Sequence, residues 1–428
     1  MSEPFPERLS REAIRARQTE RVQKLLAEIL ERNPFYRERY AGWNVDPKSI
    51  QSPEDLRQLP LLTKQELVDS QNAFPPFGRN LTYPLTDCAR LHQTSGTTGK
   101  PMRWLDTRAS WDWFMDCWAQ IYRLVGIRQE DIFAFPFSFG PFIGFWTASD
   151  ALVRCGALVI PGGGMSSETR LQMIVDHRCT VVCCTPTYAL HLITVAEKQS
   201  IDLRSTSVTR LIVAGEPGGS SAEIRSRIQD GWGATVIDHS GASEIGAWGF
   251  GSEDGTGLHV IETEFIAERL CFDDANPNGR RADDGEQAEL VLTGLGRFGG
   301  PAIRYRTGDI VRGYEQHEHP CRFLFLDGGV LGRSDDMMVI RGVNVFPSSI
   351  ESIIRQLDAT AEFRMIVTKQ GEMDTLAIET EMDAHQCDKL AKLFQRRLAM
   401  RVGVTAVPIG SLPRFEAKAK RLVDQRGR

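Results

Sequence analysis

The sequence predicts an α/β protein with mixed sheets, in which a large N-terminal part precedes a small α+β C-terminal part. Three observations lead to this class. Between Asp131 and Asp230, short apolar runs alternate with helical segments, which is typical of a parallel sheet built from crossover units. After Glu286, apolar and polar residues alternate as in antiparallel strands. From Asp335 to Arg428 the pattern becomes a short series of strands and helices.

The N-terminal elements are predicted from apolar spacing and capping residues. An amphipathic helix is expected from Arg11 to Arg32, and Asn33-Pro34 ends it. A second helix is expected after Thr63, because Glu66 stands three residues later and completes a capping box. A tryptophan-rich helix is expected from Ser110 to Leu124. The apolar side of the first helix consists of Ile14, Val22, Leu25, Leu26, Ile29 and Leu30.

The alternating section and the tail supply the remaining elements. In the alternating section, strands are expected at 131–137, 158–161, 180–184 and 211–214, and helices at 144–155, 168–177, 188–199 and 222–230. The strands at 158–161 and 180–184 should be buried, the latter with free thiols at Cys183 and Cys184. Antiparallel strands are expected at 288–293 and 322–326. The tail should contain strands at 338–341, 363–367 and 375–381, helices at 347–357 and 388–400, and one final strand. We therefore expect a large N-terminal domain at 1–333 and a small C-terminal domain at 334–428.

Composition excludes several classes of protein. The chain has 428 residues, 41% apolar and 25% charged, with a net charge of −5, as in an ordinary globular protein of two or three domains. Nothing in this charge balance suggests a nucleic-acid partner. No apolar run approaches the roughly 20 residues of a membrane span. Acidic residues near the start argue against an organelle transit peptide, so we expect a cytoplasmic protein. These residues are Glu3, Glu7, Glu12 and Glu20.

Residues 94–101 read TSGTTGKP and predict a phosphate-binding loop. Its glycines let backbone N–H groups approach an oxyanion closely, and Lys100 adds a positive charge. The string is not a Walker loop, because only two residues separate Gly96 from Gly99 and Pro101 follows the lysine. It indicates another class of nucleotide enzyme, and its alternative interpretation is a surface turn.

A second cluster, His317, His319 and Cys321, has ligand types that zinc accepts. No fourth ligand stands nearby, and Glu318 and Pro320 favour an exposed loop over a metal site. The nine cysteines are scattered through the chain, which favours free thiols.

Six further strings follow the phosphate loop in a characteristic order. They are TPTYAL at 185–190, AGEP at 214–217, DHSGASEIG at 238–246, IRYRTGD at 303–309, GRSDDMMVIRGVNVFP at 332–347 and PRFEAKAKR at 413–421. Each alone has a structural explanation. Together with RLH at 90–92 and the phosphate loop, they resemble the adenylate-forming superfamily of acyl-CoA synthetases, luciferases and nonribosomal adenylation domains. Within it the sequence is most similar to the phenylacetate–CoA ligase family.

The resemblance implies a large N-terminal domain, a small lid that rotates on a hinge, and a two-step reaction. A carboxylate attacks the α-phosphate of ATP to give an acyl-adenylate and pyrophosphate, and a thiol, usually that of coenzyme A, then displaces AMP. Glu244 would hold Mg²⁺ and would act in catalysis with Lys418, which is preferred over Lys420 on register. The ATP-binding residues that it implies are Thr94, Ser95, Gly96, Thr97, Thr98, Gly99, Lys100, Gly215, Glu216, Pro217, Asp238, Ser240, Ser243, Asp309 and Arg333.

Within that set, Gly215 to Pro217 would line the adenine pocket, Asp309 would accept hydrogen bonds from the ribose, and Arg333 would lie near ribose and phosphate. Asp335 matches the hinge, and the coenzyme A tunnel would be shaped by Arg341, Gly342 and Asn344. The sequence departs from the family pattern at three positions. Ser240 replaces an aromatic residue that normally stacks on adenine, Ala417 replaces a glycine before the lysine, and Cys321 alone remains of a cysteine pair.

The acyl group is predicted from an aromatic stretch. Phe135, Phe137, Phe139, Phe142, Phe145 and Trp146 stand where the family places its acyl pocket. They favour an aryl or arylalkyl acid, although an ordinary aromatic core would have the same composition. No aspartate occurs in 135–147 to bind an α-ammonium group, which disfavours an α-amino acid and leaves an aniline-type amine open. The pocket residues expected are Phe135, Phe137, Phe142, Tyr188 and Gly241.

We therefore expect an ATP- and Mg²⁺-dependent, AMP-forming ligase that loads an aromatic acid onto coenzyme A. The alternative is an adenylating enzyme whose acceptor is a carrier-protein thiol, an amine or another nucleophile. A ligand-binding relative without catalysis is disfavoured by the presence of Lys100, Glu244, Asp309 and Lys418. The resemblance also allows a homodimer.

Overall fold

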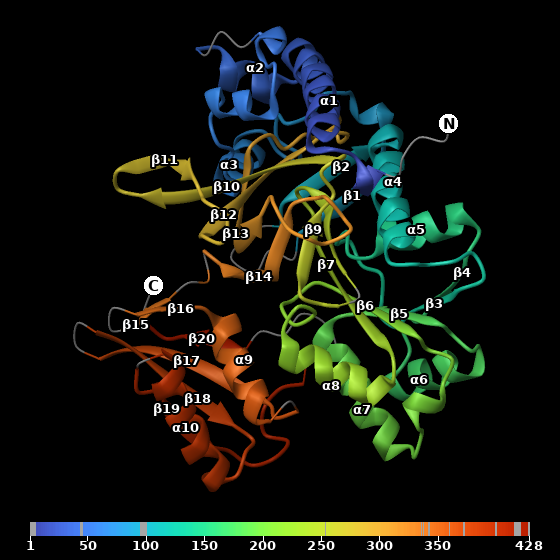
Figure 1. Cartoon of the computed structure of the whole chain (residues 1–428), viewed down its shortest axis with the longest axis vertical. Helices are drawn as coiled ribbons and strands as arrows, with labels where there is room; N and C mark the ends of the chain where they lie inside the picture. Colours follow the sequence, from blue (N-terminus) through green and yellow to red (C-terminus); the bar gives the residue numbers. More distant parts are fainter. Residues whose placement is uncertain are drawn as a thin grey trace.

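A long twisted sheet with helices on both faces confirms the predicted α/β class with mixed sheets (Figure 1). The structure is a computed structural model. It describes residues 6–42, 46–94, 101–252, 254–334, 336, 338–340, 343–358, 360–370, 373–398, 400–414 and 421–426.

Within the described residues the main sheet has twelve strands, in the order β11-β10-β12-β13-β14-β9-β8-β7-β6-β5-β3-β4. Strands β3, β4, β5, β6 and β7 pair parallel to one another. From β7 to the far edge of the sheet at β11, every neighbouring pair is antiparallel. The parallel strands are β3 (Ile132–Phe135), β4 (Leu158–Pro161), β5 (Val181–Cys184), β6 (Arg210–Val213) and β7 (Thr235–Ala242). The others are β8 (Gly246–Gly251), β9 (Gly257–Val260), β10 (Phe265–Asp273), β11 (Asn276–Arg281), β12 (Gln287–Gly294), β13 (Tyr305–Tyr314) and β14 (Phe325–Arg333). Strand β7 is thus where the pairing changes direction.

Helices cover the parallel part of the sheet from both sides because its strands alternate their side chains between two cores. In β3, Phe133 and Phe135 pack into the core that contains the residues of α4 and α5, while Ala134 packs into the core beneath α6, α7 and α8. These helices are α4 (Arg108–Leu124), α5 (Trp146–Cys155), α6 (Ser167–Asp176), α7 (Pro186–Lys198) and α8 (Ala222–Trp232). All were predicted within a few residues.

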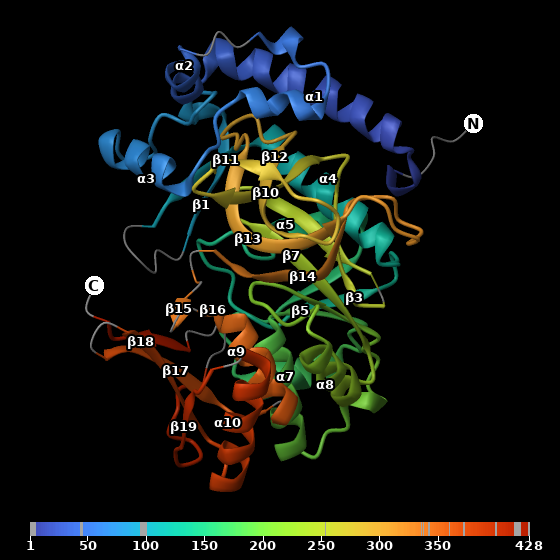
Figure 2. The ribbon, with the colours of Figure 1, turned by 60° about the vertical axis from the view of Figure 1, so that its left-hand side comes forward.

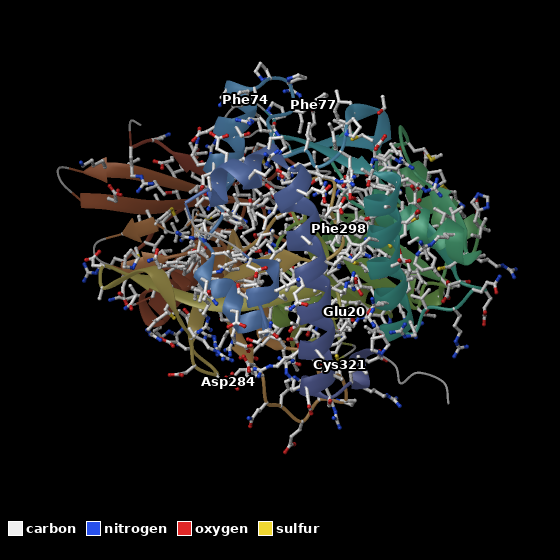
Figure 3. All side chains as sticks on the ribbon, turned by 90° about the horizontal axis from the view of Figure 1, so that it is seen from above. Glu20, Phe74, Phe77, Asp284, Phe298 and Cys321 are labelled. Carbon is white, nitrogen blue, oxygen red and sulfur yellow. The ribbon has the colours of Figure 1, made fainter. Side chains whose placement is uncertain are left out.

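Three helices lie over the opposite end of the sheet: α1 (Arg11–Arg32), α2 (Pro34–Tyr40) and α3 (Lys64–Ala73). Helix α1 has the predicted bounds and buries five of its six predicted apolar residues, with Leu30 only partly buried. Gln18 anchors it, because its amide donates to the carbonyls of Glu262 and Phe265 at 2.8 and 2.9 Å. Figure 3 looks down on this layer, with Phe298 beside α1 and Cys321 near its start.

The C-terminal part has its own core and its own four-stranded sheet, as the predicted α+β unit requires (Figure 2). Its order is β19-β18-β17-β20, and its helix α9 packs close to α8. The elements are β15 (Met338–Ile340), β16 (Val343–Val345), α9 (Pro347–Leu357), β17 (Phe363–Gln370), β18 (Met373–Thr380), α10 (Ala384–Leu398), β19 (Gly403–Ala406) and β20 (Leu422–Asp424).

Three expectations about strands were wrong. Strand β4 is an edge strand and Leu158 is 57% exposed, so that run is not buried. The strand expected from Arg322 begins only at Phe325, because the backbone N–H of Leu324 is taken by the carboxylate of Glu262 at 2.6 Å. The tail ends in two strands rather than one, since β19 pairs with β18 and β20 with β17.

Short 3-10 turns connect the larger elements, at Pro6–Arg8, Pro47–Ser49, Pro53–Gln58, Leu85–Asp87 and Leu203–Ser205. All nine cysteines are free, and Cys183 and Cys184 are buried in β5 as expected. Among the residues described, no helix is both long and apolar enough to cross a membrane.

Candidate active site

The predicted phosphate loop joins the two strands of a hairpin. Strand β1 (Cys88–Gln93) pairs antiparallel with β2 (Arg103–Thr107), and Gln93 lies opposite Arg103. The pairing continues one step further, because Thr94 N donates to Met102 O at 2.9 Å and Met102 N donates to Thr94 Oγ1 at 3.1 Å. The base of the loop is therefore held by paired backbone. Ser95, Gly96, Thr97, Thr98, Gly99 and Lys100 lie outside the described residues.

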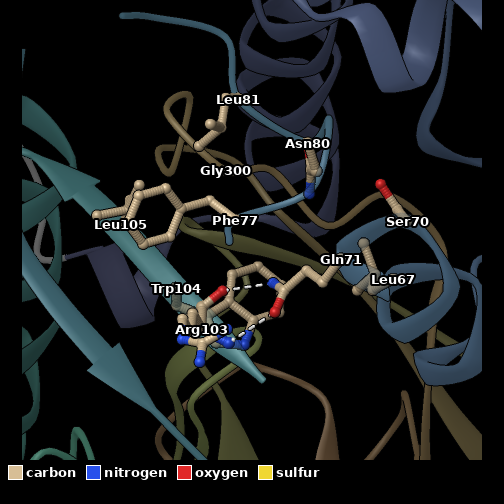
Figure 4. A pocket seen from close by; sticks show the side chains of 10 residues that line it. All are labelled: Leu67, Ser70, Gln71, Phe77, Asn80, Leu81, Arg103, Trp104, Leu105 and Gly300. Carbon is tan, nitrogen blue, oxygen red and sulfur yellow. Dashed lines mark hydrogen bonds between the residues drawn. The ribbon is translucent and has the colours of Figure 1, made fainter. Parts of the chain in front are cut away.

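Helix α3 fixes the exit strand of this hairpin through one side chain. The amide of Gln71 donates to Arg103 O at 2.6 Å and accepts from Arg103 N at 2.9 Å, so it pairs with the strand edge as another strand would (Figure 4). Both residues line a small pocket together with Leu67, Phe77 and Trp104. The predicted capping box of Thr63 and Glu66 is present at the start of the helix.

The same helix places a cation against Glu244. Glu244 follows β7 in the turn to β8, is 6% exposed, and receives the Lys64 ammonium at 3.3 Å from its Oε1. A buried carboxylate that faces a cation fits the predicted Mg²⁺ role, since Mg²⁺ prefers hard oxygen ligands. The turn is anchored from behind, because the Arg297 guanidinium donates to the carbonyls of Ser243 and Glu244 at 2.6 and 3.1 Å.

Arg297 also connects this turn to the phosphate hairpin. Its guanidinium forms a buried bidentate pair with Asp106 of β2, at 2.7 and 2.8 Å. Bidentate arginine–carboxylate pairs fix geometry as well as charge. The strand that follows the predicted phosphate loop and the turn that carries the predicted Mg²⁺ ligand are therefore joined through Arg297.

Asp309 and Arg333 are brought together as register partners on β13 and β14. Arg333 Nη1 lies 3.1 Å from Asp309 Oδ1, and Asp309 N donates to Thr307 Oγ1 at 3.0 Å. Both side chains are partly exposed, so they present a carboxylate and a guanidinium at one edge of the sheet. A ribose and a phosphate could use these two groups.

The loop after β6 contains the predicted adenine-pocket residues. Gly215 has φ +91°, a conformation that favours glycine. The Glu216 carboxylate accepts from Thr187 N at 2.7 Å, so it caps the N-terminal end of α7, and Pro217 follows it in the same loop. Asp238 accepts from Ser220 Oγ at 2.5 Å, and burial raises the pKa of Asp238 to about 6. These residues meet at the carboxyl ends of parallel strands, where open α/β sheets bind ligands.

Strand β7 continues through Ser240 and Gly241, between which its register with β8 shifts. Ser240 lies opposite Gly249 and is half-buried, while Gly241 is exposed. A Cβ at Gly241 would come within 2.9 Å of Gly246 O, so only glycine fits this bulge without a shift.

Most of the predicted aromatic residues form one cluster. Phe135 is fully buried, and its ring centroid lies 6.0 Å from Phe137, 5.8 Å from Phe139 and 5.8 Å from Phe145. The cluster extends from Phe139 to Trp146 at 4.6 Å. Trp146 is the first residue of α5, and the ring centroid of Phe145 lies 6.5 Å from that of His239 on β7.

Two predicted pocket residues are not brought to this cluster. Phe142 is 41% exposed and lies against Gly140 and Gly144. Tyr188 is buried on the opposite face of the sheet, where its hydroxyl bonds Ser167 and Arg170, both at 3.0 Å. A helical aromatic residue can face either core, and the spacing alone did not settle which one.

The histidines of the His317, His319 and Cys321 cluster pack against other rings. Among the described residues, no group of three or more His, Cys, Asp or Glu side chains could hold a metal ion. The two histidine rings are only partly exposed and lie 5.6 and 4.4 Å from the buried ring of His259, while Cys321 is 6% exposed. Glu318 and Pro320 are exposed, as expected for an exposed loop, while the two histidine rings turn inward against His259 and Phe325.

Several predicted residues lie outside the described ranges: Asp335, Arg341, Gly342, Lys418 and Lys420. The backbone of Asn344 lies in β16. Three side chains in the site were not predicted from the sequence: Lys64, Gln71 and His239. Lys64 could have been found from its place at the first helical position after Thr63, but its contact with Glu244 depends on tertiary structure.

Comparison with known proteins identifies the family. Residues 14–292 match the sequence profile of the family described as AMP-binding enzyme, and residues 342–426 match that of the AMP-binding enzyme C-terminal domain. The chain belongs to the AMP-binding enzyme family. It is 32% identical to a phenylacetate-coenzyme A ligase of Escherichia coli (strain K12), over 98% of this chain and 97% of that protein. It is 30% identical to the phenylacetate-coenzyme A ligase of Thermus thermophilus over the full length of both.

This AMP-binding enzyme also resembles solved structures of a related ligase in defined catalytic states. A crystal structure of 2-hydroxyisobutyryl-CoA ligase in the postadenylation state, in complex with R3-HIB-AMP, superimposes with a TM-score of 0.89 at 29% identity, covering 99% of this chain and 92% of that chain. The same ligase in the thioesterification state gives a TM-score of 0.74 at 29% identity with the same coverage. Because the chain belongs to this family and matches phenylacetate-coenzyme A ligases over nearly its whole length, it is an enzyme, an AMP-forming acid–thiol ligase.

Proposed function

We propose that this enzyme uses ATP to adenylate an aromatic carboxylic acid and then transfers the acyl group to coenzyme A. The observation that carries the proposal is the aromatic cluster of Phe135, Phe137, Phe139 and Phe145, which lies beside β7 in a chain whose full-length relatives include phenylacetate-coenzyme A ligases. An aromatic wall favours a flat apolar acyl group.

In the first step a carboxylate oxygen attacks the α-phosphate of ATP, and pyrophosphate leaves. The transition state spreads negative charge over phosphate oxygens and therefore needs preorganised donors and cations. The backbone and hydroxyl groups of 94–100 would surround the β- and γ-phosphates. Glu244 would hold Mg²⁺, which neutralises phosphate charge when bound. Because Lys64 lies 3.3 Å from Glu244 and is half exposed, it can move aside when the metal arrives.

The nucleoside would be held between the loop after β6 and the Asp309 edge of the sheet. Asp309 would accept hydrogen bonds from the ribose hydroxyls, which requires Arg333 to release one of its oxygens or share it. Gly215, Glu216 and Pro217 would form the adenine wall. Because Ser240 stands in place of an aromatic residue, stacking on the adenine would come from another part of the wall.

In the second step the coenzyme A thiolate attacks the acyl carbonyl carbon and forms the thioester bond. The bond between that carbon and the bridging oxygen of AMP breaks, and AMP leaves with this oxygen. We propose that residues 334–428 form the lid that turns at Asp335 between the two steps. The separate core of the C-terminal part supports a body that moves as a unit. The unequal TM-scores against two states of one related ligase, 0.89 and 0.74, support a postadenylation-like placement of the lid.

The test is pyrophosphate release from ATP and Mg²⁺ across a panel of acids, each with and without coenzyme A, with the products read by mass spectrometry. The panel contains benzoate, phenylacetate, their ring-substituted analogues, and the aliphatic acid 2-hydroxyisobutyrate. We expect acyl-CoA from an aromatic acid. Pyrophosphate without any CoA thioester would favour a carrier-protein thiol or an amine as acceptor, and turnover of the aliphatic acid alone would contradict the aromatic assignment.

A further inference from the structure

One buried imidazole lies between the aromatic cluster and the ATP-site strand, and the proposed mechanism does not use it. His239 is 7% exposed in the middle of β7. Its ring centroid lies 4.3 Å from Trp118 and 6.5 Å from Phe145. Phe145 in turn contacts Phe135 and Phe137 at 5.8 and 5.7 Å. The imidazole is therefore a polar group in the wall of the aromatic cluster.

The protein fills only part of the hydrogen-bonding capacity of this ring, which bonds the backbone of Gly249. Nδ1 of His239 is buried and has no hydrogen-bond partner in the part of the chain that the structure describes. Leaving a buried polar atom unpaired destabilises the folded protein, so a phenylalanine would pack on Trp118 at lower cost. A group that a core tolerates at such a cost is a candidate for binding a ligand.

The other edge of the ring lies beneath the exposed Gly241. A Cβ at residue 241 would come within 3.3 Å of Nε2, so glycine is the residue that leaves this edge uncovered. Gly241 belongs to the string that also carries Glu244, on the side of β7 where the ATP site is assembled. The ring thus spans from the aromatic wall to the place where the acid would meet the nucleotide.

The charge state of the ring defines what it can recognise. Burial lowers the pKa of His239 to about 4, so the imidazole is neutral at pH 7. A neutral imidazole offers one N–H donor and one nitrogen acceptor. It suits a neutral hydroxyl or amino group, each of which can donate as well as accept, and it offers no counter-charge to a carboxylate or an ammonium ion.

We propose that His239 selects the acid, by a hydrogen bond between its imidazole and a hydroxyl or amino substituent on the aromatic ring. The preferred substrates are then hydroxy- or amino-substituted aromatic acids rather than the unsubstituted ones. This inference rests on the proposed function, since it assigns a specificity residue to the same acyl site.

The experiment compares kcat/KM for pyrophosphate release between benzoate or phenylacetate and their hydroxy and amino analogues, in the wild type and in His239→Phe. One hydrogen bond worth about 1.4 kcal/mol corresponds to tenfold. We expect the wild type to prefer at least one substituted acid by about tenfold or more. His239→Phe should lose that preference and keep turnover of the unsubstituted acid, since its ring still packs on Trp118.

The matched control is His259→Phe, which replaces another buried histidine with an unpartnered nitrogen on β9, away from the cluster. It should leave the preference between substituted and unsubstituted acids unchanged. A wild type that turns over unsubstituted acids as well as every analogue overturns the inference, whether or not the variant folds, and so does a preference that survives in His239→Phe. No pyrophosphate with any acid would instead refute the proposed function.

Discussion

At the residue scale, each of the two carboxylates proposed to bind Mg²⁺ and ribose is paired with one cation. The carboxylate of Glu244 is held by Lys64, and that of Asp309 by Arg333. Both cations are partly exposed, so under the proposed function each can swing toward solvent when Mg²⁺ or the ribose takes its place. By contrast Arg297 and Asp106 are buried and paired bidentately, which makes them part of the scaffold.

The buried imidazole also makes stability depend on pH. The pKa of His239 falls from 6.5 to about 4 on folding, so the unfolded chain binds its proton more readily between these values. This contribution is complete above pH 6.5 and is lost as the pH falls toward 4. Relative to His239→Phe, the wild type should lose about 2 kcal/mol of unfolding free energy between pH 7 and pH 5. Urea unfolding of both proteins at the two pH values measures this, and parallel pH profiles would contradict it.

Many candidate site residues could be proposed from the sequence, because the chemistry of phosphate, ribose and metal binding limits which residue types serve. Glu244 and Asp309 stand in local strings that carry this information. The sequence could not predict which core a side chain faces. Tyr188 and Phe142 were therefore assigned to the acyl pocket, although one lies on the opposite face of the sheet and the other at the surface.

Among the elements, helix α3 couples two parts of the site. Its first residue, Lys64, contacts Glu244, and Gln71 two turns later pairs with both backbone groups of Arg103 in β2. The phosphate loop joins β1 to this strand. Gln71 is therefore a positioning residue, which acts on the loop through the backbone of β2.

Replacing Gln71 with Leu should loosen the loop without emptying the acyl site. We expect KM for ATP to rise about tenfold, which corresponds to the loss of about 1.4 kcal/mol of hydrogen bonding. KM for the acid should stay unchanged. Initial rates of pyrophosphate release at varied ATP and varied acid separate the two. The matched control is Gln65→Leu on the exposed face of the same helix, where Gln65 bonds only Asp69 in the described structure. Equal changes in both KM values would assign Gln71 a general structural role.

The helices were predictable because their periodicity and caps are local. The bounds of α1 and α9 match the expected residues, and Thr63 caps α3 as predicted. The hairpin of β1 and β2, and the short strands β19 and β20, depend on partners distant in sequence or on a turn with no strand-like pattern. Such pairing is tertiary and leaves little local signal.

At the scale of the whole molecule, the large N-terminal part and the C-terminal part have separate cores, and under the proposed function they would divide the reaction between them. The large body holds the described residues that we propose for the ATP and acyl sites, and the small body carries the strings at 338–347 and 413–421 in its sequence. One lysine cannot serve both half-reactions if the lid turns between them. Lys418 should therefore matter in the first step only.

The two-step mechanism with a moving lid is tested most directly by measuring the two half-reactions separately in Lys418→Ala. The first is pyrophosphate release from ATP and the acid, and the second is acyl-CoA formation from preformed acyl-AMP. We expect the first to fall by about a hundredfold or more, as when a charge-stabilising group is removed, and the second to stay near the wild-type rate. The matched control, Lys420→Ala, should leave both rates close to wild type. Undiminished adenylation in Lys418→Ala, or equal loss of both half-reactions, would contradict a two-step ligase whose lid lysine acts in adenylation.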